Sequence, residues 1–417
     1  MTSGRSKIDR MISASSVPAA PVLRNLNAVL SDIYARHVAL KKEDCELYYE
    51  VFHSIFHQIH AAMKAVDPYY DRYSGPIKYA GSHYDRLRIK KPDEYDMDIV
   101  IDIPVDKQEN RFNSSASDIV IEPKHPGYAQ LRGGVQYRNI PIRDGDDTVN
   151  NTAHRWLDEK NYILRSKFIY WFKSVFDKAL DHLSEPGKKL NTGEKNVYNI
   201  STRESGPALT LKITNPRGFR LDVDMVPVLR LPETRWPVEG YRDIPKHCDA
   251  GDWTLVPKPN KHGHDEHDEN RSWRINLQDQ ERKMMHDSHN LRMTVKLLKK
   301  LRDSKGMNKI ASYYIKTLFL WEIDERKDPY FWSRNDLATL FKHMIKKFHK
   351  ALLEKSIKFF WNPKCNLIGN VADQTLESYA NIVGNLLRSL DTYQGHVIAA
   401  KYLLTDDEFE SYKKFIH

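Results

Sequence analysis

Residues 81–101 read GSHYDRLRIKKPDEYDMDIVI, a Gly-Ser pair followed by carboxylates that alternate with apolar side chains. Alternation at every second position is typical of a β-strand whose two faces differ. Glu94, Asp96 and Asp98 are therefore expected on one face of a strand. Because like charges on one strand face repel each other, a cation is expected to lie among them. Mg²⁺ ions fit this position, since they prefer carboxylate oxygens and also hold substrate phosphates.

The Gly81-Ser82 pair adds an anion site to this stretch. Glycine lets the backbone approach a ligand closely, and free N–H groups in a turn cradle an anion. Each half is common by itself, since acidic alternation is typical of a solvated strand and Gly-Ser of an ordinary turn. In this order, with residues 83–93 between Ser82 and Glu94, the two halves resemble the nucleotidyltransferase signature and predict phosphoryl-transfer chemistry.

A second acidic strand is predicted over Phe219–Leu231, where Asp222 and Asp224 alternate with apolar residues. Two acidic faces that are far apart in the sequence are tolerated side by side when cations bridge them. We therefore expect this strand to pair with the one that carries Glu94 and Asp96.

The composition is that of a globular protein with a modest basic excess. The chain has 417 residues, of which 40% are hydrophobic and 29% charged, and this length allows two lobes with separate cores. A formal net charge of +9 is compatible with a polyanionic partner. Cys45, Cys248 and Cys365 form no CxxC pair, which is typical of reduced thiols in a cytoplasmic protein. No apolar run is long enough to cross a membrane, so no membrane partner is expected.

The order of the predicted elements indicates an α+β fold with a mixed β-sheet core. Residues 1–20 are expected to form a flexible tail. The segment Lys42–Val66 lacks Pro and Gly and carries apolar residues at a spacing of four, so it predicts a long spine helix that stops at Pro68. A further helical region is predicted over residues 152–184. Shorter strands are predicted at Ile77–Ala80, Asp118–Glu122, Ala129–Asn139, Val197–Ser201, Ala208–Thr214 and Trp253–Pro257.

The second half of the chain predicts a helical lobe. Residues 233–272 are rich in Pro, Gly and His and are interpreted as the hinge between lobes; the run His262–His267 is interpreted as a polar loop rather than a metal site. Helices are predicted over Leu291–Leu301, Ala311–Glu322, Asn335–Leu353 with Ser333 as its cap, Thr375–Leu390 and Asp406–Ile416. The expected architecture is bilobed, with a nucleotidyltransferase core over residues 21–240 and a helical C-terminal lobe over residues 241–417.

Beyond the signature, the chain resembles the cyclic GMP–AMP synthase-like receptors, in the Mab (male-abnormal) group of nucleotidyltransferases. The resemblance covers most of residues 30–395, in the family's order. It is carried by the spine helix and by the motifs Gly81-Ser82, Asp93-Glu94-Tyr95-Asp96, Val223-Asp224-Met225, Leu255-Val256-Pro257-Lys258, Ser272-Trp273-Arg274-Ile275 and Ser312-Tyr313-Tyr314-Ile315-Lys316-Thr317.

The resemblance implies roles for individual side chains. Glu94, Asp96 and Asp224 match the family's metal-binding carboxylates, which are expected to hold Mg²⁺ or Mn²⁺ and no zinc. The residues that match its nucleotide contacts are the phosphate-cradling Gly81 and Ser82, Lys258, the nucleotide-facing Arg274, Lys299 on the phosphates, the base-stacking Tyr313 and its polar neighbour Ser312. Lys296 is a rival for the role of Lys299, because the helix alignment there can slip. The resemblance assigns no role to Asp98.

One departure from the family concerns the nucleic acid that activates it. Vertebrate cyclic GMP–AMP synthase carries a His/Cys zinc ribbon between the residues that match Arg274 and Lys299, whereas residues 275–298 here contain no cysteine. The chain is more similar to the insect-type members without the ribbon, which respond to double-stranded RNA, so RNA is favoured over DNA. Phosphates on the nucleic-acid face are expected to order the turn Ser205–Leu209. The basic residues expected on that face are Lys41, Lys42, Arg282, Lys283 and Lys296.

The resemblance implies an enzyme that makes a cyclic GMP–AMP-type dinucleotide from ATP and GTP in innate antiviral signalling. Two metal ions are expected to clamp the triphosphate, activate the attacking ribose hydroxyl and stabilise the leaving pyrophosphate. The alternatives are a catalytically silent Mab-family scaffold and an RNA-activated oligoadenylate-type synthetase that shares the metal site. The intact carboxylate set argues against the scaffold, while product linkage, base choice and oligomerisation on nucleic acid stay open.

Overall fold

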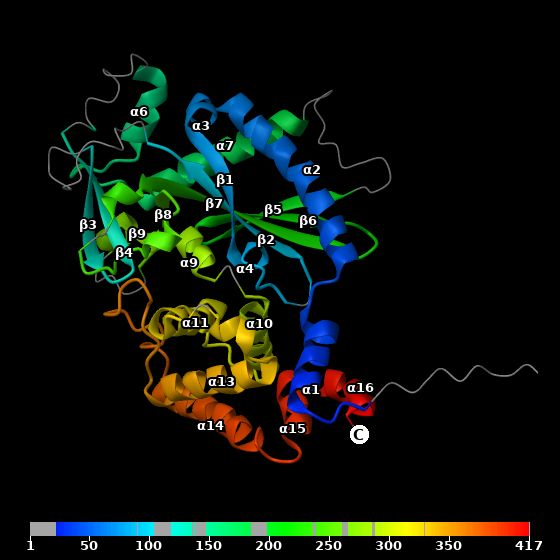
Figure 1. The fold of residues 1–417 in the computed structure, drawn as a ribbon. Coiled ribbons are helices and arrows are strands. Elements are labelled where there is room, and N and C mark those ends of the chain that lie inside the picture. Colours follow the sequence, from blue (N-terminus) through cyan, green and yellow to red (C-terminus); the bar gives the residue numbers. More distant parts are fainter. Residues whose placement is uncertain are drawn as a thin grey trace, which may run out of the picture.

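The computed structural model describes residues 22–89, 91–103, 118–135, 137, 147–184, 198–236, 239–260, 266–285, 288–328 and 330–416. A β-sheet flanked by helices forms one part of the molecule, and a cluster of helices forms the other (Figure 1). The predicted N-terminal tail and most of the run His262–His267 lie outside the described residues.

The sheet is mixed, as predicted. Its strands follow the order β1 (Ser74–Ala80), β2 (Glu94–Ile101), β7 (Arg220–Pro232), β8 (Asp252–Val256), β9 (Ser272–Asn276), β4 (Tyr128–Gly133) and β3 (Ile119–His125), while β6 (Ala208–Thr214) pairs with β7 and β5 (Asn199–Ser205) with β6. β2 and β7 are parallel, whereas the other pairs of strands are antiparallel. This arrangement confirms the α+β class and puts the two acidic strands side by side.

The predicted spine helix is confirmed as α2 (Lys42–Val66), which lies with α7 (Arg165–Ser184) over one face of the sheet (Figure 1). The ring of Phe52 stacks on Tyr95 of β2 at 4.7 Å between centroids, so the apolar face of that strand packs on the helix. The chain then turns into α3 (Pro68–Tyr73), with Asp67 as its N-cap. Since the apolar face of β2 is covered by α2, its carboxylates point to the opposite side of the sheet.

The helix predicted over residues 152–184 is wrong for residues 156–164, which are not helical. α6 (Asp147–Arg155) and α7 are separate helices, joined by a segment in which Leu157 and Ile163 form an isolated bridge. Asp158 Oδ1 accepts hydrogen bonds from the backbone N–H groups of Lys160 (2.8 Å) and Tyr162 (2.9 Å). An aspartate that binds nearby backbone amides competes with helix formation, which is why the helix is interrupted here.

The helical cluster contains α10 (His289–Ser304), α11 (Ser312–Arg326), α12 (Phe331–Arg334), α13 (Leu337–Leu353), α14 (Asp373–Ser389), α15 (Gly395–Leu403), α16 (Asp406–Tyr412) and the 3₁₀ turn η5 (Lys413–Phe415). The predicted cap of α13 is wrong, because Asp336 Oδ1 accepts the N–H of Thr339 at 2.8 Å and Ser333 belongs to α12. Short elements between the strands are α4 (Gly81–Tyr84), η3 (Glu233–Arg235), η4 (Lys246–Cys248) and α8 (Glu266–Arg271), and α9 (Gln278–Met284) follows the last strand.

Each end of the chain crosses the predicted division at residue 240. α1 (Leu26–Ile33) and the π-helical turn η1 (Tyr34–Val38) lie among the C-terminal helices (Figure 1), and the N–H of Ala338 donates to Asn27 Oδ1 at 3.2 Å. Conversely, β8 and β9 belong to the sheet although they follow residue 240. The core therefore extends to α9, and the first helix packs with the last ones.

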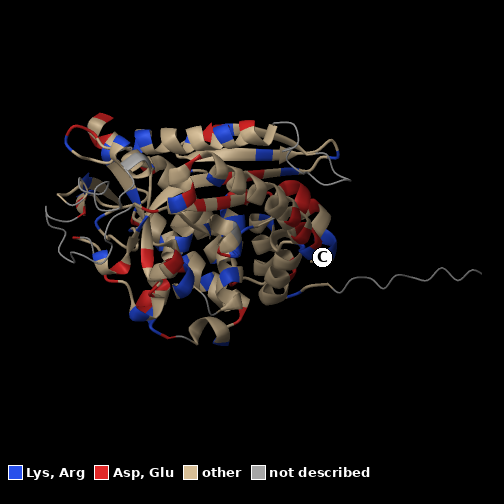
Figure 2. Ribbon diagram, turned by 90° about the horizontal axis from the view of Figure 1, so that it is seen from above, with Lys and Arg blue, Asp and Glu red and all other residues tan. Residues whose placement is uncertain are grey.

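Charged residues of both signs are interspersed over most elements (Figure 2). Acidic residues gather on α16, beside the C-terminus, where Asp406, Asp407 and Glu408 fill the first turn. Among the helices of the described segments, none combines the length and the apolar character needed to cross a bilayer.

Candidate active site

The two acidic strands are in register, so their carboxylates converge. Glu94 pairs with Asp222 and Asp96 with Asp224 across the parallel β2–β7 ladder. Carboxylate oxygens of Glu94, Asp96 and Asp224 all lie within 4.8 Å of one another. The pairing predicted from the sequence is confirmed, and the set of hard oxygen donors fits a divalent metal ion.

The electrostatics of these carboxylates favour a bound cation. Burial, with the neighbouring charges of Glu94 and Asp224, raises the pKa of Asp96 to about 6. Burial also raises the pKa of Asp224, although the hydroxyl of Thr210, which donates to Asp224 Oδ1 at 2.5 Å, opposes the rise. A divalent ion would reverse both shifts, because it favours the ionised form of each group.

Arg88 supplies a positive charge at the edge of this cluster. Its guanidinium donates to Asp93 Oδ1 at 2.6 Å and to Glu94 Oε2. Although burial lowers the pKa of Arg88, the hydrogen bonds and charges of Asp93 and Glu94 raise it overall. Glu94 is thus partly neutralised by the chain itself, while Asp96 and Asp224 face each other across the ladder.

Gly81 begins α4 directly against the acidic cluster. Its φ of 67° lies in the left-handed region, and a Cβ at this position would overlap the carboxylate of Asp96. Only glycine satisfies both conditions. The backbone at Gly81 therefore lies directly against the acidic strand, the close approach that the predicted phosphate cradle needs.

A cavity of about 380 Å³ lies between the sheet and the helical cluster. Its walls include every residue that was predicted to contact nucleotide, namely Gly81, Ser82, Lys258, Arg274, Lys299, Ser312 and Tyr313. Gly81 also touches Asp96, so the cavity adjoins the acidic cluster at this end. The geometry is that of a pocket with carboxylates at one end.

Two of these wall residues are held in defined positions. Lys299 Nζ donates to the backbone oxygen of Leu87 at 2.7 Å, and burial, with the charges of Arg302 and Arg88, lowers the pKa of Lys299 to about 8. Near the ring of Tyr313 lies the guanidinium of Arg274, 5.5 Å from the ring centroid. Lys299 lines the cavity, whereas its rival Lys296 packs 5.7 Å from the ring of Tyr34, outside the cavity wall.

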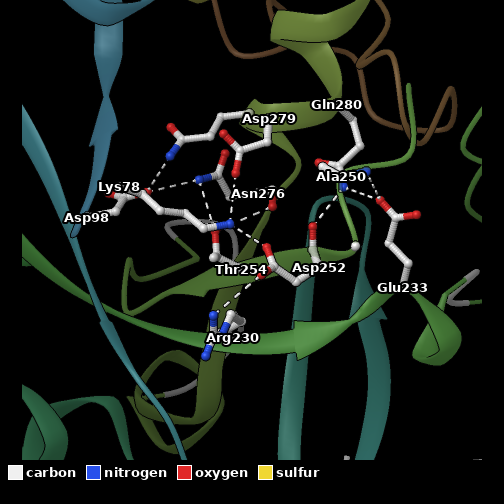
Figure 3. Close-up of polar contacts among 12 residues, drawn as sticks. Lys78, Asp98, Arg230, Glu233, Ala250, Asp252, Thr254, Asn276, Asp279 and Gln280 are labelled. Atoms are coloured by element: carbon white, nitrogen blue, oxygen red, sulfur yellow. Dashed lines mark hydrogen bonds and ion pairs between the residues drawn. The ribbon is translucent and has the colours of Figure 1, made fainter. Parts of the chain in front are cut away.

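Asp98 has hydrogen-bond partners that were not predicted from the sequence. Its Oδ2 accepts from Gln278 Nε2 at 2.9 Å and from Asn276 Nδ2 at 3.4 Å, and Figure 3 shows the contact with Asn276. Both residues also line the cavity. Burial, with the charges of Asp96 and Asp279, raises the pKa of Asp98 to about 7. In the sequence, Asp98 differs from the preceding carboxylates only by its place further along the strand, so no signal set it apart.

A larger network surrounds Asp98. Lys78 Nζ of β1 donates to Asp279 Oδ2 at 2.7 Å and also contacts Asp252, which lies 3.7 Å from Arg230 (Figure 3). These contacts join β1, β7, β8 and α9. Because the charges alternate in sign and are partly buried, the network fixes α9 on the sheet.

The residues predicted to bind nucleic acid fall into two groups. Lys41, Lys42 and Lys283 are exposed. The expectation that Lys296 lies on an exposed face is wrong, because only 7% of the residue is exposed, and burial lowers the pKa of its amine to about 8. Arg282 is half-buried, with its guanidinium bonded to Asp279 at 2.7 Å and to Asp85 at 3.2 Å.

Comparison with known proteins identifies the family. Residues 83–287 match the Mab-21 protein nucleotidyltransferase domain, and residues 290–385 match the Mab-21 protein HhH/H2TH-like domain. Two similar proteins, each named cyclic GMP-AMP synthase-like receptor, come from Ctenocephalides felis and Tribolium castaneum. The first is 30% identical over 94% of this chain and 90% of its own length, and the second is 30% identical over 92% and 93%.

A further relative of the same name, from Aethina tumida, is 28% identical over 91% of this chain and 92% of its own length. The two domain matches meet between α9 and α10, where the structure also passes from the sheet to the helical cluster. The similarity therefore spans both parts of the fold and the cavity between them. The chain belongs to the Mab-21 nucleotidyltransferase family, among the cyclic GMP–AMP synthase-like receptors, and is a nucleotidyltransferase.

Proposed function

We propose that this nucleotidyltransferase joins ATP and GTP into a cyclic GMP–AMP-type dinucleotide. The observation that carries the proposal is the cavity of about 380 Å³, in which the predicted nucleotide-contacting residues meet beside Glu94, Asp96 and Asp224. The name of the relatives from Ctenocephalides felis and Tribolium castaneum supports the same product class. By the same resemblance, we propose a cytoplasmic role in innate antiviral signalling.

Different residues of the cavity bind different parts of the nucleotide. The backbone of Gly81 and Ser82 and the ammonium of Lys299 bind the triphosphate, while Tyr313 stacks on a base and Arg274 faces the nucleotide. Glu94, Asp96 and Asp224 would hold Mg²⁺ or Mn²⁺. When bound, such ions supply Lewis-acid activation of a ribose hydroxyl and charge neutralisation at the leaving pyrophosphate. The protein itself contributes positioning and preorganised charge, so the reaction requires no covalent nucleophile.

Double-stranded RNA is the proposed activator. Lys41, Lys42 and Lys283 offer exposed positive charge, and Pro207, in the turn between β5 and β6, lines the cavity. Phosphates that bind the exposed lysines would order this turn beside the nucleotide. RNA is preferred over DNA in this proposal because residues 275–298 contain no cysteine that could form a zinc ribbon. Binding through phosphates should weaken steeply with salt and show little sequence preference.

Two alternatives use the same pocket. An oligoadenylate-type synthetase would share the carboxylates and differ in its product. A silent scaffold would not need to keep Glu94, Asp96 and Asp224 in register, and the structure keeps them within 4.8 Å of one another. The product therefore decides between the two enzymes.

The test is a product assay with purified full-length chain, labelled ATP and GTP, Mg²⁺ and either duplex RNA or duplex DNA. Chromatography and mass spectrometry should identify a cyclic dinucleotide that appears with RNA and not with the Asp96→Asn variant. A linear oligoadenylate would replace the proposal by the second enzyme. The absence of product with RNA and DNA at several lengths would favour the scaffold.

A further inference from the structure

Lys316 occupies a central position in the wall of the cavity. Its ammonium lies 2.6 Å from Asp85 Oδ2 and 3.0 Å from Glu281 Oε2. The side chain of Lys316 is 8% exposed, that of Asp85 11% and that of Glu281 4%. The carboxylates raise the pKa of Lys316 to about 12 in spite of the opposing effect of burial, so the ammonium of Lys316 stays protonated.

The two carboxylates belong to different ends of the cavity. Asp85 directly follows α4, and its backbone N–H donates to the oxygen of Gly81 at 3.2 Å, so it moves with the predicted phosphate cradle. Glu281 lies on α9, and its Oε1 accepts from the hydroxyl of Tyr313 at 2.7 Å and from Trp361 Nε1 at 3.0 Å. Glu281 therefore moves with the ring that is predicted to stack on a base.

We infer that Lys316 is a positioning residue that holds the phosphate cradle and the base-stacking ring at a fixed separation, through Asp85 on one side and Glu281 on the other. The inference rests on the proposed function, since it assigns the two ends of the cavity to the two ends of one nucleoside triphosphate. Lys316, Asp85 and Glu281 come from α11, the segment after α4, and α9, so the cluster joins elements from both parts of the fold.

Physical considerations favour positioning over stability as the role of this cluster. A buried ion pair is weak evidence for stability, because desolvation offsets most of the attraction between the charges. Its value lies in geometry, since Lys316 bonds both carboxylates at once, while Arg282 of α9 also holds Asp85 at 3.2 Å. The phosphates and the base of a nucleotide are covalently joined and bind to separate subsites. This link adds to the affinity only when the two subsites are held at the distance that separates phosphate and base in the ligand.

This argument predicts a specific pattern of binding. The double substitution Asp85→Asn with Lys316→Met removes one negative and one positive charge, so the net charge of the wall is unchanged. We expect the affinity for an intact, non-hydrolysable nucleotide, α,β-methylene-ATP with Mg²⁺, to fall at least about tenfold. The affinities for inorganic tripolyphosphate and for adenosine, which each occupy one subsite, should stay within about twofold.

The matched control is the pair Lys300→Met with Glu408→Gln. Lys300 is also a buried lysine in an ion pair, 2.5 Å from Glu408, and it lies on α10, outside the cavity wall. This control should bind all of the probes as the wild type does. If the double substitution prevents folding, the single and nearly isosteric Asp85→Asn replaces it. Because this variant gains one net positive charge, its nucleotide affinity should fall at least about tenfold relative to its tripolyphosphate affinity.

The outcomes separate the two claims. Calorimetry with the full chain should show selective loss of nucleotide binding in the variant. An unchanged nucleotide affinity, or an equal loss for all of the probes, overturns the positioning role while the proposed function stands. Failure of the wild type to bind any of the probes overturns the proposed function itself.

Discussion

Gly81 lies against the carboxylate of Asp96, so that the first residue of α4 and the central residue of the acidic cluster share a contact that leaves no room for a Cβ. The contact joins the predicted phosphate cradle to the predicted metal site. It also explains why a glycine is needed at the end of β1, where the chain turns with a φ of 67°.

Gly81→Ala should abolish most of the activity while the protein stays folded. The added methyl group displaces Asp96 and strains the turn, so kcat should fall by at least about a hundredfold, as small misplacements of reacting groups do. Gly218→Ala is the matched control, because Gly218 also has a positive φ, of 85°, with nothing near its Cβ position. Steady-state kinetics should separate the two variants; equal activities would contradict the role of the contact.

Asp96→Asn should stabilise the metal-free protein. The pKa of Asp96 is raised to about 6 in the folded state, so above this pH the buried charge opposes folding, and the penalty shrinks as the pH falls towards the unfolded value. In excess EDTA near neutral pH the free energy of unfolding should rise by about 1–3 kcal/mol, and the gain should disappear near the pKa of a free carboxyl group. Urea denaturation of the variant and the wild type at several pH values measures this difference in the free energy of unfolding. A variant that is less stable than the wild type at every pH would contradict the raised pKa of Asp96.

Thr210→Val should shift the acid limb of the pH–rate profile to higher pH. The Thr210 hydroxyl lowers the pKa of Asp224, so its removal raises that pKa, and a carboxylate must be ionised to hold a metal ion. Thr294→Val serves as the control, since Thr294 is also buried but bonds only the backbone of Asn290 at 2.7 Å in α10. A profile of kcat/KM against pH that is identical in both variants would argue against a role for Thr210.

Lys299→Arg should extend activity to higher pH. Since burial lowers the pKa of Lys299 to about 8, its positive charge is lost as the pH rises through this value, and kcat/KM should fall with it. Arginine stays charged, so the fall in kcat/KM at high pH (the basic limb of the profile) should disappear. Lys296 has a pKa of about 8 as well but lies outside the cavity wall. Lys296→Arg should therefore keep the basic limb, and the opposite result would assign the phosphate contact to Lys296.

The acidic cluster was predictable because its signal is local. The side chains of a strand alternate with period two, so the faces of Asp96 and Asp224 follow directly from the sequence. Their mutual repulsion requires a cation wherever the strands meet, and the parallel register of β2 and β7 brings them together. The spine helix was predictable for the same reason, since an uninterrupted apolar stripe without Pro or Gly has few alternatives.

The cluster around Lys316 was not predictable from local pattern. Asp85 and Glu281 lie in polar stretches that are typical of a solvated surface, whereas Lys316 interrupts an apolar run, and the three side chains meet only after the sheet and the helices pack. The same limit explains β9. A strand was predicted from local pattern where β8 lies, at Trp253–Pro257, but none was predicted at Ser272–Asn276, and long-range pairing with β4 and β8 places this short strand in the sheet.

The central claim is that Glu94, Asp96 and Asp224 hold a divalent ion beside the Gly81 turn. A crystal of the full chain grown with Mn²⁺ and a non-hydrolysable nucleotide, measured at the manganese absorption edge, tests it most directly. The account predicts an anomalous peak among these carboxylates, with the triphosphate between the peak and Lys299. A cavity that binds the nucleotide with no manganese peak there, or with the peak elsewhere, would contradict it.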